Sequence, residues 1–277
     1  MVTAMRGDRA RSALGETRFA DVRWVDETGS TNRDLLDLAA AGAPEGVVVV
    51  ADLQHAGRGR LDRSWHAPAG GSLLVSILFR PLLGATDAHL LTTAVGVSAA
   101  AACRSVGGVA PRLKWPNDLV VEVEGSDGPG AATSDRKLAG ILAESTVEGG
   151  RLAAVVVGIG LNVNWPADLP PELADIAIAL NHLTGHEVDR EDLLIALLSH
   201  LDQWCTTLQA PDRAAQLMAQ ARAWSATLGR TIRVDLGDEQ IVGEAVELTD
   251  DGALVVGRER RVVVAGDVVH LRSLDRP

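Results

Sequence analysis

Hydrophobic and polar residues alternate with the two-residue period of a strand near the start of the chain and with a helical period just after it. Residues 19–28, "FADVRWVDET", predict a strand, and residues 29–42, "GSTNRDLLDLAAAG", predict a helix. We expect Ser30 or Thr31 to cap the helix N-terminus and Gly42 to end it. A strand followed closely by a short helix is therefore expected at the beginning of the folded part.

Two apolar runs, at 45–54 and 72–81, flank a polar, glycine-rich stretch at 55–71. The runs predict buried strands because they are rich in Val, Leu and Ile, whereas the stretch between them predicts a loop. The alanine-rich residues 85–107 predict a long helix that covers one face of the sheet and ends near Gly107.

The second half of the chain changes its period twice. Residues 112–164 predict a strand meander with one flexible loop at 125–135, and residues 171–225 have helical periodicity. Beyond Gly229, short alternating runs broken by "GDE", "DDG" and "AGD" predict a small β-barrel. The fold class is therefore predicted to be α+β, with three parts: a flexible N-terminal tail (1–18), a mixed-sheet domain (19–228) and a β-barrel domain (229–277).

The charge of the chain limits what it can bind. Its formal net charge is −11 and its pI is near 5.1, which argues against a general nucleic-acid binder because phosphate neutralisation needs a surplus of basic residues. Any anion site must therefore be local. The one dense basic cluster is Arg58, Arg60 and Arg63.

Composition also bears on the compartment. The longest apolar stretch, at 152–161, is about half as long as the roughly 20 residues of a membrane span, so no transmembrane helix is expected. The N-terminal segment lacks the apolar core of a secretory signal. Cys103 and Cys205 lie in apolar surroundings far apart in the sequence, which predicts packed, reduced thiols. A cytoplasmic location is expected.

Lysine is almost absent from this chain. Only two of the 26 Lys and Arg residues are lysines, Lys114 in "RLKWPND" and Lys137 in "DRKLAGILAE". A compact ammonium and a planar guanidinium are not interchangeable at a tight anion site, so these two positions are candidates for specific chemistry.

The glycine-rich loop is the first candidate site. Gly57 and Gly59 would let backbone amides approach a ligand closely, while Arg58 and Arg60 project bidentate donors suited to phosphate or carboxylate. The loop therefore predicts an anion cradle. The alternative is a solvated surface turn.

The segment "KWPND" is the second candidate. Pro116 favours an extended Trp115, and the following pair turns the chain so that Asn117 and Asp118 present their oxygens together. Hard oxygens beside Lys114 suit Mg²⁺ with nucleotide phosphates. The alternative is a plain turn.

The segment "RKLAGILAE" is the third candidate. In a regular strand Lys137 would share a face with Ala139 and Ile141, with Gly140 leaving space beside them. A lysine on an apolar face is costly unless it meets an anion, and the alternative is an edge lysine that guards the sheet.

Two further patterns do not support common nucleotide or metal sites. The segment "GIGLNVN" at 158–164 lacks a third glycine and no helix begins there, so it is not a Rossmann turn. His182 and His186 are separated by Gly185 and have no third ligand nearby, which indicates a structural role.

Five segments taken in order resemble those of the biotin protein ligases: "GSTN", "QHAGRGRLDRSW", "KWPND", "RKLAGIL" and "GIGLNVN". The resemblance runs from about residue 20 to residue 272. It implies a class II synthetase-like catalytic domain of the biotin/lipoate ligase type with covering helices, plus the small C-terminal barrel. It also implies that biotin and ATP form biotinyl-5′-AMP, and that a lysine of a biotin carboxyl carrier domain of acetyl-CoA carboxylase or a related carboxylase then accepts the biotin.

The resemblance assigns roles to individual positions. Lys137, Arg58 and Arg60 would be catalytic, and Asp118 would hold Mg²⁺. The implied biotin-binding residues are Ser30, Thr31, Asn32, Gln54, Gly57, Arg58, Gly59, Arg60, Lys137, Gly140 and Leu142. The implied nucleotide-binding residues are Arg63, Trp65, Lys114, Asn117 and Asn162.

The chain departs from the family pattern in three places. Asp62 replaces the last glycine of the loop, which puts the closed shape of the loop in question, and the segment at 125–135 is longer than the family needs. Few residues precede the first strand, so we expect no DNA-binding domain and a monofunctional ligase.

Two other functions compete with this interpretation. A lipoate ligase or octanoyltransferase would share the fold, and a biotin-responsive regulator would bind DNA, which the acidic charge disfavours. No membrane partner is expected, and the sequence is compatible with a homodimer.

Overall fold

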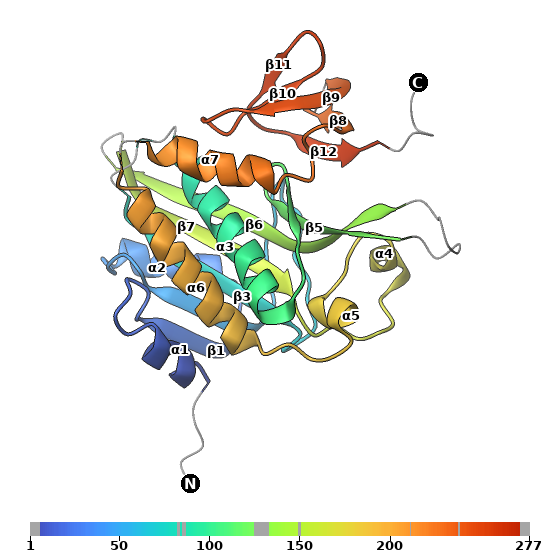
Figure 1. Ribbon diagram of the computed structural model, residues 1–277. Helices are drawn as coiled ribbons and strands as arrows, with labels where there is room; N and C mark the ends of the chain where they lie inside the picture. Colours follow the sequence, from blue (N-terminus) through green and yellow to red (C-terminus); the bar gives the residue numbers. More distant parts are fainter. Residues whose placement is uncertain are drawn as a thin grey trace.

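Two β-sheets organise the chain (Figure 1). The structure is a computed structural model and describes residues 6–81, 84, 87–124, 133–148, 151–210, 212–237 and 239–271. In this part of the chain, the larger sheet has seven strands in the order β1-β2-β3-β7-β6-β5-β4. Its strands are β1 (Val22–Thr28), β2 (Val48–Gln54), β3 (Ser72–Phe79), β4 (Arg112–Lys114), β5 (Asp118–Val123), β6 (Ser134–Glu148) and β7 (Arg151–Asn162).

The larger sheet is mixed, as predicted. β1 and β2 run parallel, and every other neighbouring pair in it is antiparallel. Both faces are buried, which explains the continuous apolar runs: Val48 and Val50 enter one core cluster, while Val49 between them enters another. The two clusters lie on opposite faces because successive strand residues point in opposite directions.

Helices cover both faces of this sheet. α3 and α6 pack against each other on one face (Figure 1), while α2 packs against β2, β3 and β7 on the other. The described helices are α1 (Asp8–Ala13), α2 (Thr31–Ala40), α3 (His89–Gly107), α4 (Pro171–Ala174), α5 (Leu180–Thr184), α6 (Arg190–Thr207) and α7 (Arg213–Ala223). α2 begins after the N-cap Ser30, and Gly42 follows its end with a left-handed φ of 87°.

Among the described helices, α3 is long and apolar enough to cross a membrane by length and composition. However, 61% of its most apolar window is buried inside the protein. It contacts α6, β6 and β7, so packing in the core accounts for its hydrophobicity.

The N-terminal segment contains a packed helix where the sequence predicted a flexible tail. Ala10 and Leu14 on α1 and just after it are 0% exposed, and Arg9 pairs with Asp189 at the N-terminus of α6 at 2.7 Å. The prediction of a flexible tail at 1–18 is therefore wrong for the residues of this helix. The residues that hold the helix lie about 180 positions away in the sequence, so the local sequence pattern could not reveal them. Residues 1–5 lie outside the described part.

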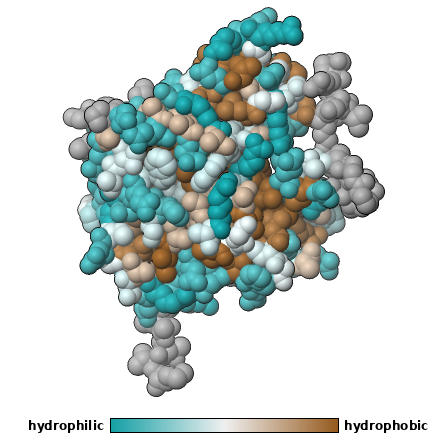
Figure 2. Space-filling view, in the orientation of Figure 1, coloured by the Kyte–Doolittle hydropathy of each residue, from teal (hydrophilic) through white to brown (hydrophobic). Residues whose placement is uncertain are grey.

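The C-terminal module is a small antiparallel sheet in the order β11-β10-β9-β8-β12 within the described residues. Figure 2 shows hydrophobic residues gathered on this module, where Val242, Val246, Val262 and Val264 are exposed. Its strands are β8 (Thr231–Asp235), β9 (Gln240–Leu248), β10 (Leu254–Val256), β11 (Arg261–Val263) and β12 (Asp267–His270).

The predicted strand meander at 112–164 is confirmed as β4 to β7. Of the flexible loop predicted at 125–135, residues 125–132 lie outside the described part, while β6 already begins at Ser134.

Candidate active site

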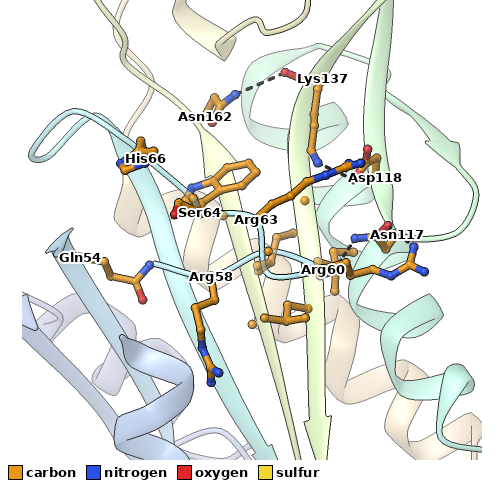
Figure 3. A pocket seen from close by; sticks show the side chains of 18 of the residues that line it. Gln54, Arg58, Arg60, Arg63, Ser64, His66, Asn117, Asp118, Lys137 and Asn162 are labelled. Atoms are coloured by element: carbon orange, nitrogen blue, oxygen red, sulfur yellow. Dashed lines mark hydrogen bonds and ion pairs between the residues drawn. The ribbon is translucent and has the colours of Figure 1, made fainter. Parts of the chain in front are cut away.

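A cavity of about 470 Å³ opens on the α2 side of the larger sheet (Figure 3). Its floor is formed by β6 and β7, its closed end by the start of α2, and its mouth by the loop between β2 and β3. The segment from Pro170 to Ala177 forms the remaining wall. The volume is typical of a site for small ligands.

Polar groups line the closed end of the cavity. The backbone N–H of Thr31 donates to Gln54 Oε1 at 2.7 Å, and the hydroxyl of Thr31 lies 2.7 Å from Ser76 Oγ. Ser76 in turn donates to Asn32 Oδ1 at 2.6 Å. Ser30 caps α2 without a side-chain capping bond, so its hydroxyl is available to a ligand.

Glycines keep the floor of the cavity low. A Cβ at Gly140 would lie 2.9 Å from Trp65 Cζ3, and one at Gly160 would lie 2.6 Å from Trp65 Nε1. Gly140 and Gly160 are directly paired across β6 and β7. The indole of Trp65 therefore rests on these two glycines, which explains why both segments need a residue without a side chain.

A bulge in β6 decides where Lys137 points. Leu119 pairs with Ala139 and Val120 with Lys137, so Leu138 is an extra residue in the strand. Such a bulge moves the residues before it to the other face. The prediction that Lys137 shares a face with Ala139 is therefore wrong, since its ammonium lies over Gly140 on the cavity side.

Lys137 is held by groups from three directions. Its ammonium lies 2.7 Å from Asp118 Oδ1 and 5.4 Å from the centre of the Trp65 ring. Its backbone N–H donates to Ile176 O at 2.7 Å, and its carbonyl accepts from Ile178 at 3.0 Å. The backbone is therefore pinned by the segment before α5, while the side chain stays 36% exposed towards the cavity.

The arginine loop folds as a small hairpin across the mouth. Arg58 and Ser64 form an isolated antiparallel bridge, and the N–H of Gly59 donates to Arg63 O at 2.7 Å. Leu61 and Asp62 at its tip have left-handed φ angles of 55° and 56°. Asp62 thus adopts the conformation that glycine takes most easily, and Asp tolerates it better than most residues.

Each loop arginine has a different partner. Arg58 donates to Glu144 at 2.5 Å, and Arg63 pairs with Asp267 at the start of β12. Arg60 donates to Asn117 Oδ1 at 3.1 Å and to a backbone carbonyl of the C-terminal module. Within the described residues, Arg60 forms no salt bridge, so its charge is not neutralised by a carboxylate.

Figure 3 shows that the three arginines diverge. Arg60 and Arg63 extend towards Asn117, Asp118 and Lys137, whereas Arg58 points to the opposite side of the cavity. The positive charges near Lys137 in this arrangement therefore come from Arg60 and Arg63.

Apart from Asp118 Oδ1, which is ion-paired with Lys137, two buried polar atoms of the site have no hydrogen-bond partner among the described residues, Trp65 Nε1 and Asn162 Oδ1. Buried polar groups are normally satisfied, and unsatisfied ones cost free energy. The amide nitrogen of Asn162 is used, since it donates to Ile178 O at 3.0 Å. A ligand that supplies partners for the indole and for the amide oxygen would therefore be stabilised here.

Most of the residues singled out from the sequence come together. Gly57 and Lys114 do not line the cavity: Gly57 lies at the base of the hairpin, and Lys114 lines an adjoining cavity of about 280 Å³. The predicted residues that line the main cavity are Ser30, Thr31, Asn32, Gln54, Arg58, Gly59, Arg60, Arg63, Trp65, Asn117, Asp118, Lys137, Gly140, Leu142 and Asn162.

The sequence did not point to several residues that shape the site. Ser76 completes the polar closed end, Gly158 makes room for Asn32, and Asp267 and Glu144 hold loop arginines. Of these residues, Gly158 belongs to a pattern noted in the sequence, the glycine pair in "GIGLNVN". Glu144 ends the segment "RKLAGILAE", but nothing in that segment marks it as a partner of the loop, and Ser76 and Asp267 lie outside the motifs.

The site fits Mg²⁺ carried with a nucleotide. The described residues contain no group of three or more His, Cys, Asp or Glu side chains that could hold a metal ion. Mg²⁺ commonly uses one or two carboxylates and completes its shell with phosphate oxygens and water. Asp118, beside Lys137 at the cavity, can supply one such carboxylate.

Two family models match the chain. Residues 24–162 match the biotin/lipoate A/B protein ligase family, and residues 227–271 match the biotin protein ligase C-terminal domain. The second match covers the C-terminal sheet.

Individual proteins are similar over most of the chain. It is 38% identical to the biotin–[acetyl-CoA-carboxylase] ligase of Mycobacterium tuberculosis, over 96% of this chain and 98% of that protein. It is 31% identical to the bifunctional ligase/repressor BirA of Bacillus subtilis, over 84% of this chain and 68% of that protein. Among solved structures, a biotin protein ligase from Aquifex aeolicus in complex with biotin and ATP superposes with a TM-score of 0.74 at 26% identity, covering 92% of this chain and all of that one.

Proposed function

The chain belongs to the biotin/lipoate A/B protein ligase family, and on this premise we propose that it is a biotin–[biotin carboxyl carrier protein] ligase. It activates biotin with ATP as biotinyl-5′-AMP and transfers the biotin to a lysine of a carrier domain. The observation that carries this proposal is the shape of the cavity: a neutral polar closed end lies opposite a cluster of cations around Lys137. A ligand with a polar, uncharged head and an anionic tail fits both ends.

The closed end suits the ureido head of biotin, which carries one carbonyl acceptor and two N–H donors. Gln54 uses its Oε1 to accept from Thr31, which leaves its amide nitrogen as a donor. The Ser30 hydroxyl is also available. We therefore assign Ser30, Thr31, Asn32 and Gln54 to the biotin head, with Leu142 on the floor.

The opposite end suits the reaction itself. A biotin carboxylate oxygen attacks the α-phosphorus of ATP, a new P–O bond forms, and the bond to pyrophosphate breaks. Both reactants are anionic, so local cations must lower their repulsion and stabilise the charge of the transition state. Lys137 and Arg60 are placed to stabilise this charge, because Lys137 contacts Asp118 and Arg60 contacts the neighbouring Asn117 (Figure 3).

The nucleotide would lie beside the indole. Among the described residues, Trp65 and Asn162 each keep one polar atom without a hydrogen-bond partner, and Arg63 lines the same cavity from the loop. We assign these residues to ATP, with Asn117 holding Arg60 in place. Bound Mg²⁺ would neutralise phosphate charge, with Asp118 as its protein carboxylate.

The arginine loop would also protect the product. An acyl-adenylate is hydrolysed readily by water, and the hairpin spans the mouth of the cavity from β6 to the C-terminal module. Closure of this loop over the intermediate would exclude water until the amine of the carrier lysine attacks the carbonyl and AMP leaves.

The partner is the biotin carrier domain of a carboxylase. Similarity to a biotin–[acetyl-CoA-carboxylase] ligase supports acetyl-CoA carboxylase or a related enzyme. We propose a cytoplasmic location, which the thiols support: Cys103 and Cys205 are unpaired, and burial raises the pKa of each to about 12. Buried, protonated thiols of this kind are inert to oxidation.

The decisive experiment incubates the protein with ATP, Mg²⁺ and either biotin or lipoate, and detects the acyl-adenylate by mass spectrometry. We expect biotinyl-5′-AMP, followed by biotin transfer when a purified carrier domain is added. A lipoyl-adenylate as the sole product would instead show a lipoate ligase. Omission of Mg²⁺ should abolish the first step.

A further inference from the structure

Glu144 on β6 joins the arginine loop to the closed end of the cavity. Its two carboxylate oxygens are used separately: Oε1 accepts from Arg58 at 2.5 Å, and Oε2 accepts from the amide of Asn32 at 2.9 Å. Its side chain is 22% exposed and does not line the cavity. It therefore acts on the ligand only through the two residues that it holds.

The charge of Glu144 sets the orientation of Asn32. An ionised carboxylate can only accept hydrogen bonds, so Asn32 must turn its NH₂ group towards Glu144. The same nitrogen reaches Leu142 O at 3.3 Å. The amide oxygen of Asn32 is then left to accept from Ser76 at 2.6 Å.

This orientation continues along the network through Ser76 to the hydroxyl of Thr31. The single hydroxyl proton of Ser76 goes to Asn32, so Ser76 can only accept from Thr31, whose hydroxyl lies 2.7 Å from Ser76 Oγ and 3.0 Å from Gln54 Oε1. Gln54 Oε1 keeps the N–H of Thr31 as its donor at 2.7 Å. The donor–acceptor order therefore runs in one direction from Thr31 to Glu144, while Gln54 Oε1 accepts from Thr31 at the other end, so the Gln54 NH₂ group takes no part in these bonds.

The packing around Asn32 leaves no second arrangement. Asn32 is 5% exposed, and a Cβ on the neighbouring Gly158 would overlap its amide oxygen. A residue enclosed in this way cannot rotate to find other partners, so the loss of one partner leaves a buried polar group unsatisfied.

Resting on the proposed function, we propose that Glu144 is a positioning residue for biotin. It orients Asn32, and through it the donors and acceptors offered to the ureido head, and it restrains the loop by holding Arg58. Arg58 is half exposed and points away from Lys137, so its charge is directed to Glu144 and not to the reacting carboxylate in this state. Because the same carboxylate binds Asn32 and Arg58, the orientation of the biotin-binding amide and the position of the loop depend on each other.

The test compares Glu144→Gln with Glu144→Asp and with the matched control Glu148→Gln. Glutamine has the same shape but supplies one acceptor oxygen instead of two, whereas Glu148 is an exposed carboxylate on the same strand. We expect Glu144→Gln to raise the Kd for biotin about tenfold or more by calorimetry, while the KM for ATP stays within about twofold. Glu144→Asp should fall between the wild type and Glu144→Gln, because it keeps the charge.

A second measurement tests how firmly the hairpin is held, by the rate at which trypsin cleaves it. Trypsin cleaves after arginine, and Arg58, Arg60 and Arg63 lie on the hairpin. Without ligand, the hairpin of Glu144→Gln should be cut several-fold faster than that of wild type or Glu148→Gln. Melting temperatures of all variants establish that the difference is not general unfolding.

The outcomes separate this inference from the proposed function. If the wild type binds no biotin, the proposed function itself is wrong. If the wild type binds biotin and Glu144→Gln binds it equally well with the loop cut at the same rate, only the role of Glu144 is refuted. A loss of biotin and ATP binding together, with a lowered melting temperature, would make Glu144 a merely structural residue and also refute the inference.

Discussion

At Lys137 a compact ammonium fits where a guanidinium would not. Its Nζ lies 2.7 Å from Asp118 and only 3.0 Å from the position of a Cβ on Gly140, with the Trp65 ring nearby. Lys114, the other lysine, lines the adjoining cavity and not the main one. The two lysines of this arginine-rich chain therefore differ in how strictly their geometry demands lysine.

We predict that Lys137→Arg sharply reduces adenylate formation although it keeps the charge. A misplaced cation should cost on the order of 10²-fold in rate, as the loss of one stabilising donor does. Pyrophosphate release measures the effect, and Lys114→Arg is the control with a smaller loss. Near-normal release by Lys137→Arg would show that any cation suffices.

Gly158→Ala should disrupt the closed end of the cavity. The new Cβ would overlap Asn32 Oδ1 and come within 3.1 Å of Ser76 Oγ, and neither side chain has room to move. We expect a stability loss of about 1–3 kcal/mol by chemical denaturation, together with weakened biotin binding. Gly107→Ala is a suitable control, because its Cβ would meet nothing closer than 3.8 Å.

At the scale of elements, the arginine hairpin and the bulged strand β6 build the site together. The hairpin supplies the cations and the lid, while the bulge at Leu138 turns Lys137 onto the cavity face. The hairpin contacts β6 through Arg58, the turn before β5 through Arg60, and the C-terminal module through Arg60 and Arg63. These contacts hold the hairpin at three places.

We predict that Arg60→Gly leaks the intermediate. The change removes the hydrogen bond to Asn117, the contact with the C-terminal module and the cation itself. Biotinyl-5′-AMP should then escape and label bystander proteins in a mixture, which blotting with streptavidin detects. Release of the adenylate no faster than from the wild type would contradict a protective role for the loop.

At the scale of the whole molecule, a partly buried charge cluster joins the two sheets. Asp135 on β6 accepts from Arg230 and from His270 Nδ1, each at 2.6 Å, and Lys114 contributes its charge nearby. Glu122 also approaches Arg230 at 3.7 Å. The cluster holds β12 in place, and β12 in turn holds the loop through Asp267.

This cluster predicts that acid loosens the attachment of the C-terminal module. Burial lowers the pKa of His270 below its ordinary value of 6.5, although Asp135 opposes the shift. The folded state therefore binds fewer protons than the unfolded state just below that pH, and the stabilisation is lost as the pH falls through this window. The pKa of Asp135 is also lowered: burial alone would raise it, but His270 and Arg230 outweigh burial, so its own contribution is lost only at more acidic pH.

The measurement is the melting temperature as the pH falls from neutrality through the window just below pH 6.5, because the pKa of His270 is lowered from that value. The wild type should lose more stability over this range than His270→Asn, which has no titrating group at that position. An equal loss in both proteins would exclude His270 as the source.

The sequence by itself determined the strands and helices, and it determined the site residues that belong to recognisable motifs. Strand and helix periods are local properties, so the order from β1 to β7, the long helix α3 and the C-terminal sheet could be predicted from them. The motifs named fifteen residues that line the cavity, because each motif places its chemistry within a few positions.

Only the tertiary structure decided which groups hold these residues and which way they point. Arg58 meets Glu144 over a separation of 86 positions and Arg63 meets Asp267 over 204, while α1 is held by α6 from an equally distant segment. The face of Lys137 depends on one unpaired residue, Leu138, which appears only when β5 and β6 are aligned. Local pattern cannot contain such information, because partners and register arise only when segments far apart in the chain are packed together.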